Sequence, residues 1–594
     1  MNKKPYPAPS TQTSYPLYKR ARKHLYTLLT LSIFAFIATA QKHACAQNET
    51  TQDGINQQQT SNSVNYAITE SLGLLTAKDK GSYGKGLYQN TKRSDLVFLL
   101  KDLKQSNWIS MRPALRDFLL TQADATALQN DVPITPGEDI LTLRLKALTQ
   151  LGYHKEAFSL YRKAAENSLV EQTVRAGIYA MLYNKQKGLA CLEVKTVKQR
   201  FKSTPFWKEI NTYCEHTLAN KTQQNKTAPD NDITHPIVRT VLTSPDYTFA
   251  YTPENFTALS QVERAILTAE ERISPEYITP ETITKIPPDH ISLLLTQESK
   301  ELSFLQEALL LGAAIDYAIK PPQAMAKFYE KILTKYENQE QSDLSQATKD
   351  LLELAQLHQE TTQSWLVTGR KEKIARALEL AIPYTDKLLI SFLPVIDKME
   401  IDQEISLTII ENLAALFFHA PENIPEEWIE DLMKIFSTKN IATRKTAEKL
   451  AISLYLMRKD NKKALKNKIR THLSTQYLNS NLAKSTKNII ENIDRDPNDG
   501  DKVSPNSVIG FDLANNKRYT MPPYYVSSAL KQASQNQDIS VSLLLSAHLL
   551  GKISKKETYI GVIDEIASAL SNLGIKTTPR HLIAQAVLVN GEGS

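Results

Sequence analysis

The stretch that decides the fold runs from residue 142 to residue 165: Thr-Leu-Arg-Leu-Lys-Ala-Leu-Thr-Gln-Leu-Gly-Tyr-His-Lys-Glu-Ala-Phe-Ser-Leu-Tyr-Arg-Lys-Ala-Ala. Apolar residues recur every three or four positions on both sides of Gly152, which is the spacing of one face of an α-helix. Gly152 therefore ends one predicted helix before the next begins. Ala157, Tyr161 and Ala164 line the second helix; the alanines let two helices approach closely, and the Tyr161 ring fills the gap. The stretch predicts a pair of packed helices.

Helical periodicity extends beyond this pair, and near the end of the chain it places five apolar residues on one face: Ile560, Ile563, Ala567, Leu570 and Leu573. Alternation of apolar and polar residues, the pattern of a β-strand, is rare. Glycine accounts for 18 of the 594 residues, about half of its usual share of ~7%. That scarcity disfavours turn-rich β-folds and glycine-lined nucleotide folds. The sequence therefore predicts an all-α protein.

A helix-start pattern, a hydroxyl residue before proline, occurs at six places: Thr135-Pro136, Thr204-Pro205, Thr252-Pro253, Ser274-Pro275, Thr279-Pro280 and Thr578-Pro579. The hydroxyl can accept a hydrogen bond from a free amide of the first turn. Proline at the first helical position gives up no donor that the helix needs. The pattern predicts many helices of moderate length with short connections.

The pair at 142–165 resembles one tetratricopeptide-type helical hairpin. It departs from that family in lacking a proline at its end, close to Leu169. The resemblance implies an α-solenoid of stacked helix pairs, in which Gly152, Ala157, Tyr161 and Ala164 pack one repeat. The alternative interpretation is an ordinary hairpin of two helices.

Further segments are similar to a family of uncharacterised, secreted, all-helical repeat proteins of alphaproteobacteria. They are Cys191, Phe206-Trp207, Tyr213-Cys214, the run 259–267 and Leu311-Gly312-Ala313-Ala314. This resemblance is loose in sequence but spans much of the body. It implies an exported α-solenoid and implies no activity.

The first 46 residues read as a secretory signal peptide. A basic cluster at 17–24 precedes an apolar run at 25–40, and two small-x-small sites end at Ala40 and Ala46. This order of features is typical of a cleaved leader. The alternative is an uncleaved anchor with its positive end in the cytoplasm. Both interpretations export the body, so we expect a periplasmic protein, tethered to the inner membrane if the leader is retained.

The charge of the chain is concentrated in this leader. Residues 1–46 carry seven Lys and Arg side chains and no acidic one, so that 64 basic residues balance 64 acidic residues in the rest. A nucleic-acid-binding protein would carry its basic excess on the folded body. We therefore expect no nucleic-acid partner, and contact with a membrane only through an uncleaved leader.

Polar segments set the predicted boundaries, because they bury too little apolar surface to offset the entropy of ordering them. We expect a signal peptide at 1–46, a polar and largely disordered linker at 47–90, a helical repeat region with a disulfide hairpin at 91–220, a linker at 221–250, a central helical array at 251–493, a linker at 494–522 and a C-terminal helical segment at 523–594.

Two cysteines remain if the leader is cleaved after Ala46, namely Cys191 and Cys214. In an oxidising compartment a lone pair tends to form a disulfide, here between two helices that meet near Thr204-Pro205. The chain-entropy argument gives such a bond at most about 3.4 kcal/mol. The alternative is a pair of reduced, buried thiols. A lone pair without a nearby histidine is a poor metal site.

Catalytic signatures are weak. The eleven histidines are scattered, and no HExxH or GxSxG motif occurs. Glu298-Ser299, after an apolar run, is similar to the catalytic Glu-Ser of lytic transglycosylases, whose chemistry needs a protonated Glu in a cleft. The Gly-Leu-Met-Gln segment of that family is missing, and 300–305 continues as an amphipathic helix. We expect no catalytic, cofactor-binding or metal-binding residue.

These observations favour an exported, non-enzymatic scaffold or adaptor that binds other envelope proteins through a helical-repeat surface. The alternative is a periplasmic peptidoglycan-cleaving enzyme of the lytic transglycosylase type, with Glu298 as its acid.

Overall fold

The computed structural model describes residues 64–104, 106, 108–201, 204–218, 235–244, 246–297, 302–337, 344–363, 369–398, 405–458, 465, 467–469, 471, 524–551 and 560–590. The predicted signal peptide, the predicted linker at 494–522 and Glu298 lie outside these residues.

The described chain is mostly helical, which confirms the all-α prediction. In its first half the elements, with η for 3₁₀ helices, are α2 (Tyr66–Ser71), η1 (Lys85–Tyr88), α3 (Arg93–Lys101), α4 (Met111–Leu120), η2 (Ala125–Ala127), α5 (Ile140–Gln150), α6 (His154–Ala164), α7 (Glu171–Tyr183), α8 (Lys187–Val197), α9 (Pro205–Leu218), α10 (Pro236–Thr243), β1 (Phe249–Ala250), α11 (Pro253–Ala258), α12 (Gln261–Ala269), β2 (Ile273–Ser274), η4 (Ile283–Lys285) and α13 (Pro288–Leu294).

In the described part of the second half, every regular element is a helix. Its elements are α14 (Phe304–Asp316), α15 (Gln323–Tyr336), α16 (Gln346–Gln363), α17 (Arg370–Ala381), η6 (Asp386–Lys398), α18 (Ile405–Ala414), η7 (Leu416–Phe418), η8 (Pro421–Asn423), α19 (Glu426–Ile435), α20 (Ile441–Met457), α23 (Tyr524–Gln535), α24 (Ile539–Gly551), α25 (Ile560–Asn572) and α26 (Thr577–Asn590). β1 and β2 form a short parallel pair, with Phe249 opposite Ile273. Within the described ranges, no helix is long and apolar enough to cross a membrane.

The hydroxyl–proline pattern marks helix starts at some sites and turns at others. Pro253 begins α11, where the Thr252 hydroxyl accepts a hydrogen bond from the Asn255 amide at 3.1 Å. Pro205 likewise begins α9. Pro136, in contrast, lies in a turn, and α5 begins later with Asp139 as its cap. The fixed φ of proline suits the first helical position and the second position of a β-turn equally, so the pattern alone cannot separate them.

The predicted helix pair is α5 and α6, and it packs more widely than the sequence showed. Ala157, Tyr161 and Ala164 are fully or almost fully buried. The Tyr161 ring lies against α7, where a Cβ on Gly177 would overlap it. The Tyr161 hydroxyl donates a hydrogen bond to the Glu193 carboxylate of α8 at 2.8 Å. One aromatic side chain thus connects three helices, α6, α7 and α8.

Gly152 is needed at the turn between α5 and α6 for two reasons. Its φ of +84° lies in the left-handed region that residues with a Cβ rarely adopt. A Cβ would also lie 2.6 Å from the backbone oxygen of Pro288, at the start of α13. The turn therefore brings the α5–α6 pair into close contact with α13. The solenoid arrangement of stacked pairs stays a prediction.

Cys191 and Cys214 lie at disulfide distance, with an S–S separation of 2.06 Å and a Cα–Cα separation of 5.2 Å. They join α8 to α9, as the sequence predicted for this hairpin. The Trp207 indole of α9 also donates a hydrogen bond to Glu171 of α7 at 2.8 Å. Together these contacts hold α9 against the α7–α8 pair.

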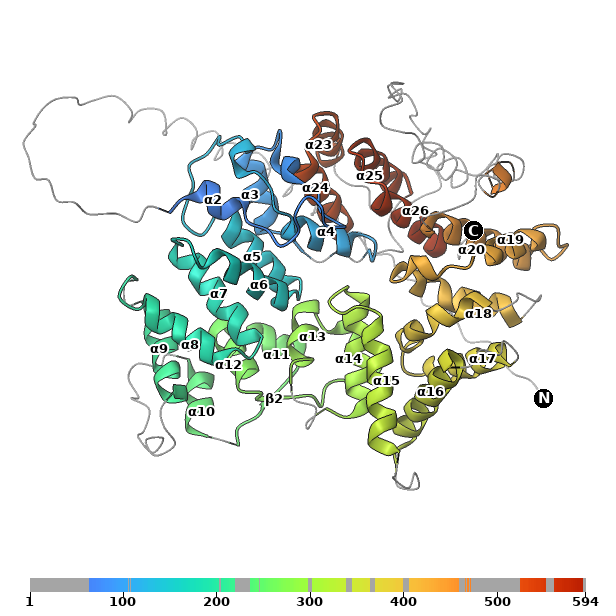
Figure 1. Ribbon diagram of the computed structural model, residues 1–594, viewed down its shortest axis with the longest axis horizontal. Coiled ribbons are helices and arrows are strands. Elements are labelled where there is room, and N and C mark those ends of the chain that lie inside the picture. The colour runs from blue at the N-terminus through green and yellow to red at the C-terminus, as the bar shows by residue number, and fades with distance from the viewer. Residues whose placement is uncertain are drawn as a thin grey trace, which may run out of the picture. The chain divides into compact units, whose positions relative to one another are not determined.

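The C-terminal helices pack against the first helices of the described chain. α24 contacts η1, α3 and α4, and α26 contacts α20 and α4 (Figure 1). The Ser540 hydroxyl donates to the Leu87 carbonyl, and the Thr91 hydroxyl donates to the Asp538 carboxylate, both at 2.7 Å. The predicted C-terminal segment at 523–594 is therefore part of one compact unit with the helices near residue 90.

Two predicted linkers contain ordered structure. The sequence predicts a linker over 47–90, whereas residues 64–90 form α2 and η1, and Leu87 and Tyr88 are buried. A linker is also predicted over 221–250, whereas this range contains α10 and β1, and Val238 of α10 is buried. In both cases apolar side chains at the end of a polar stretch find a core contact far away in the sequence, which offsets the cost of ordering.

The close packing at Gly152 makes a testable prediction. We expect Gly152→Ala to lower the free energy of unfolding by about 3 kcal/mol, because it adds both backbone strain and steric overlap. Gly574→Ala is the matched control: Gly574 also has a positive φ, +75°, but no atom lies within 4 Å of a Cβ placed there. It should cost only about 1 kcal/mol. Equal losses for the two variants in urea unfolding would contradict the close contact with α13.

Buried histidines predict an acid-sensitive fold. Burial lowers the pKa of His154 and of His581 to about 4, and that of His290 to about 3. These groups stay neutral in the folded protein but gain a proton near pH 6.5 when it unfolds. Their contribution to stability is therefore complete above pH 6.5 and is lost as the pH falls toward 4.

His581→Gln isolates one of these groups. The glutamine amide can still donate to the Met457 carbonyl, which lies 3.1 Å from His581 Nε2. We expect the dependence of unfolding free energy on pH between 4 and 6 to become shallower by about 1.4 kcal/mol per pH unit. Urea titrations at several pH values measure this slope. Parallel curves for the variant and the wild type would show that His581 does not titrate on unfolding.

Candidate functional site

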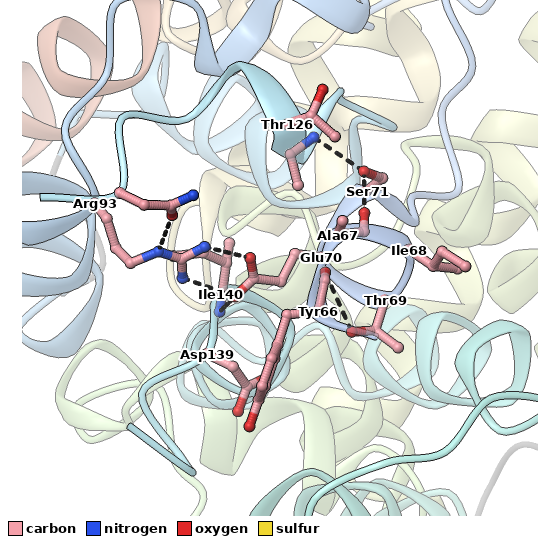
Figure 2. Close-up of polar contacts among 12 residues, drawn as sticks. Tyr66, Ala67, Ile68, Thr69, Glu70, Ser71, Arg93, Thr126, Asp139 and Ile140 are labelled. Carbon is pink, nitrogen blue, oxygen red and sulfur yellow. Dashed lines mark hydrogen bonds and ion pairs between the residues drawn. The ribbon is translucent and has the colours of Figure 1, made fainter. Parts of the chain in front are cut away.

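An ion pair between Glu70 of α2 and Arg93 of α3 is buried in the first part of the described chain (Figure 2). The two side chains are 1% and 3% exposed. Two parallel hydrogen bonds join the guanidinium to the carboxylate, at 2.9 and 2.6 Å. This bidentate geometry is the strongest that a charged pair adopts, and each charge depends on the other because water does not reach them.

The same two side chains hold both ends of the loop between residues 130 and 139. Arg93 Nε donates to the side-chain oxygen of Asn130 at 2.7 Å, where the loop begins. Glu70 Oε1 accepts from the backbone amide of Ile140 at 2.9 Å, where α5 begins. The loop is therefore fixed at both ends by one buried pair.

Further bonds hold the loop along α3. Asp131 accepts from the backbone amide and the hydroxyl of Ser94, at 3.0 and 2.5 Å. Glu138 accepts from Lys101 Nζ at 2.5 Å. Ser94, Phe98 and Lys101 follow one another at helical spacing on one face of α3. The loop therefore runs along the face that bears Phe98.

Phe98 is the most exposed of the large hydrophobic side chains that the structure describes, at 71%. On the loop, Val132 and Pro133, which follow the Ser94-bonded Asp131, are also exposed. We call Phe98, Val132 and Pro133 the Phe98 surface. Aromatic side chains, phenylalanine among them, are enriched at protein–protein interfaces relative to the rest of the surface.

A second exposed apolar pair, Leu189 and Leu192, lies on α8 beside the Cys191–Cys214 bond. Both leucines are aliphatic, and both are less exposed than Phe98. We therefore regard the Phe98 surface as the candidate site and use α8 as a comparison.

Charged groups surround Phe98. Asp95 precedes Phe98 by three residues on α3, and Asp102 is the first residue after the end of that helix. The hydrogen bonds from Ser94 lower the pKa of Asp131, so this carboxylate is ionised at neutral pH. Lys104 lies 3.9 Å from Asp102. Within the described chain, Asp95 has no ion-pair partner.

The residues singled out from the sequence lie elsewhere and are buried. Gly152, Ala157, Tyr161 and Ala164 belong to the α5–α6 pair, and the two cysteines to α8 and α9. The Tyr161–Glu193 hydrogen bond brings the first group into contact with α8. These residues position helices and cannot themselves contact a partner.

Other clusters of titratable groups are structural. The partly buried Asp316 carboxylate, at the end of α14, lies 2.9 Å from Arg112 of α4 and 3.5 Å from Lys387 of η6. Lys387, His419 and Arg112 together hold its pKa well below the usual value, against the opposing effect of burial. A carboxylate so occupied cannot exchange a proton near neutral pH. It joins three segments that are far apart in the sequence.

A second cluster involves the two histidines near α13. The Tyr251 hydroxyl lies 3.1 Å from His290 Nδ1, and His154 Nε2 lies 3.2 Å from the Asp289 carbonyl. Burial raises the pKa of Asp289 to about 6. Tyr251 and both histidines are buried, so substrate has no direct route to them. Among the described residues, no group of three or more His, Cys, Asp or Glu side chains could hold a metal ion.

The sequence held a signal for the exposure of Phe98 but none for the loop bonded to the same helix. Phe98 is an aromatic residue out of phase with the buried Leu96, Leu99 and Leu100 of the same helix. An apolar residue on the polar face of a helix is the pattern of an unfilled contact. The loop partner was hidden, because the Asp131–Ser94 and Glu138–Lys101 bonds join residues far apart in the sequence.

Comparisons with protein-family models, with curated proteins and with solved structures find no match for this chain. The resemblances drawn from the sequence therefore stay predictions.

Substitution of Glu70 tests whether the buried Glu70–Arg93 pair supports the Phe98 surface. We expect Glu70→Gln, which keeps the shape of the side chain, to lower the free energy of unfolding by about 3–5 kcal/mol because it leaves the Arg93 charge buried and unpaired. Amide hydrogen exchange should accelerate over residues 130–139 before other regions.

Glu138→Gln is the matched control at the far end of the loop. It removes an ion pair whose side chains are 46% and 41% exposed, so the loss should be about 0–1 kcal/mol. If the two variants lose equal stability, the buried pair is not the anchor of the loop.

Proposed function

We propose that this protein is an exported, non-enzymatic scaffold or adaptor that binds other envelope proteins, and that the Phe98 surface is a contact for one of them. The observation that carries the proposal is the exposure of Phe98 on a loop-and-helix support that a buried ion pair holds in place.

The Phe98 surface is ordered before any partner binds. A binding surface that is already ordered loses little conformational entropy when a partner arrives, so more of the contact energy appears as affinity. Here the loop at 130–139 is already ordered by the Glu70–Arg93 pair and by the Ser94–Asp131 and Lys101–Glu138 bonds. Burial of an exposed phenylalanine then supplies apolar contact energy of about 1.5–3 kcal/mol.

The other described helices are also held in place by specific contacts, which supports a binding role. The described helices are held by a cysteine pair at disulfide distance, by Tyr161 and by partly buried charges such as Asp316. Arrays of packed helices commonly present long surfaces to partner proteins. Export of the body, and its periplasmic location, rest on the leader at 1–46 and are part of the proposal.

Substitution in the native envelope tests the proposal. Proteins cross-linked to the wild type should be identified by mass spectrometry, and the same experiment repeated with Phe98→Ala and with Leu192→Ala. We expect Phe98→Ala to lose at least one partner that Leu192→Ala retains, because both remove an exposed apolar side chain but only one belongs to the Phe98 surface. Loss of the same partners by both variants, or by neither, would contradict it.

A zymogram on purified peptidoglycan tests the alternative. Clearing by the wild type that disappears with Glu298→Gln would replace the scaffold with an enzyme of the lytic transglycosylase type. We expect no clearing and no effect of Glu298→Gln on the cross-linked partners.

A further inference from the structure

We infer that the Phe98 surface accepts a cationic side chain, lysine or arginine, from a basic segment of the partner, held between the Phe98 ring and the Asp95 carboxylate. This inference rests on the proposed function and names the chemistry of its partner.

Most of the other partly exposed phenylalanines of the described chain have a cation of the chain itself near the ring. The Arg162 guanidinium lies 5.8 Å from the centre of the Phe158 ring, and that of Arg200 lies 5.3 Å from Phe201. Lys335 Nζ lies 4.6 Å from the Phe304 ring. The electron-rich face of an aromatic ring attracts a positive charge at such distances.

Phe249 and Phe98 are the partly or fully exposed phenylalanines without a cation in the described chain. The Phe249 ring contacts that of Phe256, with centres 6.1 Å apart. Phe98 has neither a cation nor a ring contact among the described residues. Its face is therefore open to a charge from outside.

Asp95 lies three residues before Phe98 on the same helix. Residues at this spacing are neighbours on the helix surface. Asp95 is exposed, and the described residues offer it no ion-pair partner. The neighbouring carboxylates differ: Glu138 is bonded to Lys101, and Lys104 lies near Asp102. Asp95 and Phe98 are thus neighbours on the surface of α3 and have no cation among the described residues, while the charge that interacts with Asp95 is another carboxylate, that of Asp538.

A cation between the two satisfies both groups at once. The carboxylate supplies the charge and the hydrogen-bond acceptor, and the ring supplies an apolar face along which the side-chain methylenes can lie. Val132 and Pro133, exposed on the adjacent loop, fit an apolar residue next to the cation. A purely apolar partner segment would remove water from the Asp95 carboxylate without supplying a positive charge, and burying an unpaired charge is unfavourable.

Peptide binding to the full-length protein tests this chemistry. The probes are two fluorescein-labelled peptides, Gly-Arg-Leu-Arg-Gly and Gly-Gln-Leu-Gln-Gly, with blocked ends, and the measurement is fluorescence anisotropy. We expect the arginine peptide to bind more tightly. Asp95→Asn and Phe98→Leu should each weaken its binding about two- to five-fold, while the glutamine peptide is unaffected by Asp95→Asn. Leucine keeps the apolar contact but removes the ring.

Asp102→Asn is the matched control, since Asp102 flanks Phe98 on the other side but has Lys104 nearby. It should change the affinity less than Asp95→Asn does. The inference is overturned if both peptides bind equally, or if Asp95→Asn and Asp102→Asn have the same effect. Such a result, together with loss of a partner by Phe98→Ala in the envelope, would leave the Phe98 surface as a binding site of another chemistry. Retention of every partner by Phe98→Ala would remove the proposed function itself.

Discussion

The buried ion pair between Glu70 and Arg93 is the constraint on which the candidate site depends. It joins α2 to α3, and the same two side chains hold the loop from Asn130 to Ile140 at both ends. Neither charge has water to replace a lost partner, so the pair is formed completely or the region rearranges. An exposed ring such as Phe98 can serve as a rigid anchor only because this support beneath it is fixed.

Polar contacts of the same kind connect distant parts of the helical body. Asp316 at the end of α14 holds Arg112 of α4 and Lys387 of η6. Asp538 accepts from Thr91, which attaches α24 to the segment before α3. Apolar packing brings the helices together without strong preference for one arrangement, whereas these directional bonds are satisfied in one register. We infer that they select the arrangement in which α3 and its loop are presented.

The sequence predicted what depends on neighbouring residues. The α5–α6 pair and the turn at Gly152 follow from local spacing, and the structure places them so. The pairing of Cys191 with Cys214 follows from their being the two cysteines after the predicted leader, and they lie at disulfide distance. The ordering of residues 64–90 was missed because its cause is distant: Glu70 is fixed by Arg93 and by the amide of Ile140, 70 positions later in the chain. Composition alone cannot reveal a partner so far away.

The Phe98 surface was missed for a related reason. Phe98 stands out from the apolar face of α3, but its support is made of bonds to Asp131 and Glu138 that only the fold brings close. The predicted residues are buried and structural, so a search for catalytic or metal-binding motifs had nothing to find there. The phase of Phe98 on α3 indicates its exposure, but the loop bonded to the same helix becomes visible only when the helices are packed.

Photo-cross-linking from position 98 tests the central claim most directly. A benzoylphenylalanine in place of Phe98, in the native envelope, should cross-link to a defined partner protein, and the yield should fall sharply when Glu70→Gln is added under conditions where the variant remains folded. The same probe at Leu192 should not give this product. Absence of a specific product from position 98, or a yield that Glu70→Gln does not change, would contradict the claim that the buried pair supports a protein-binding surface.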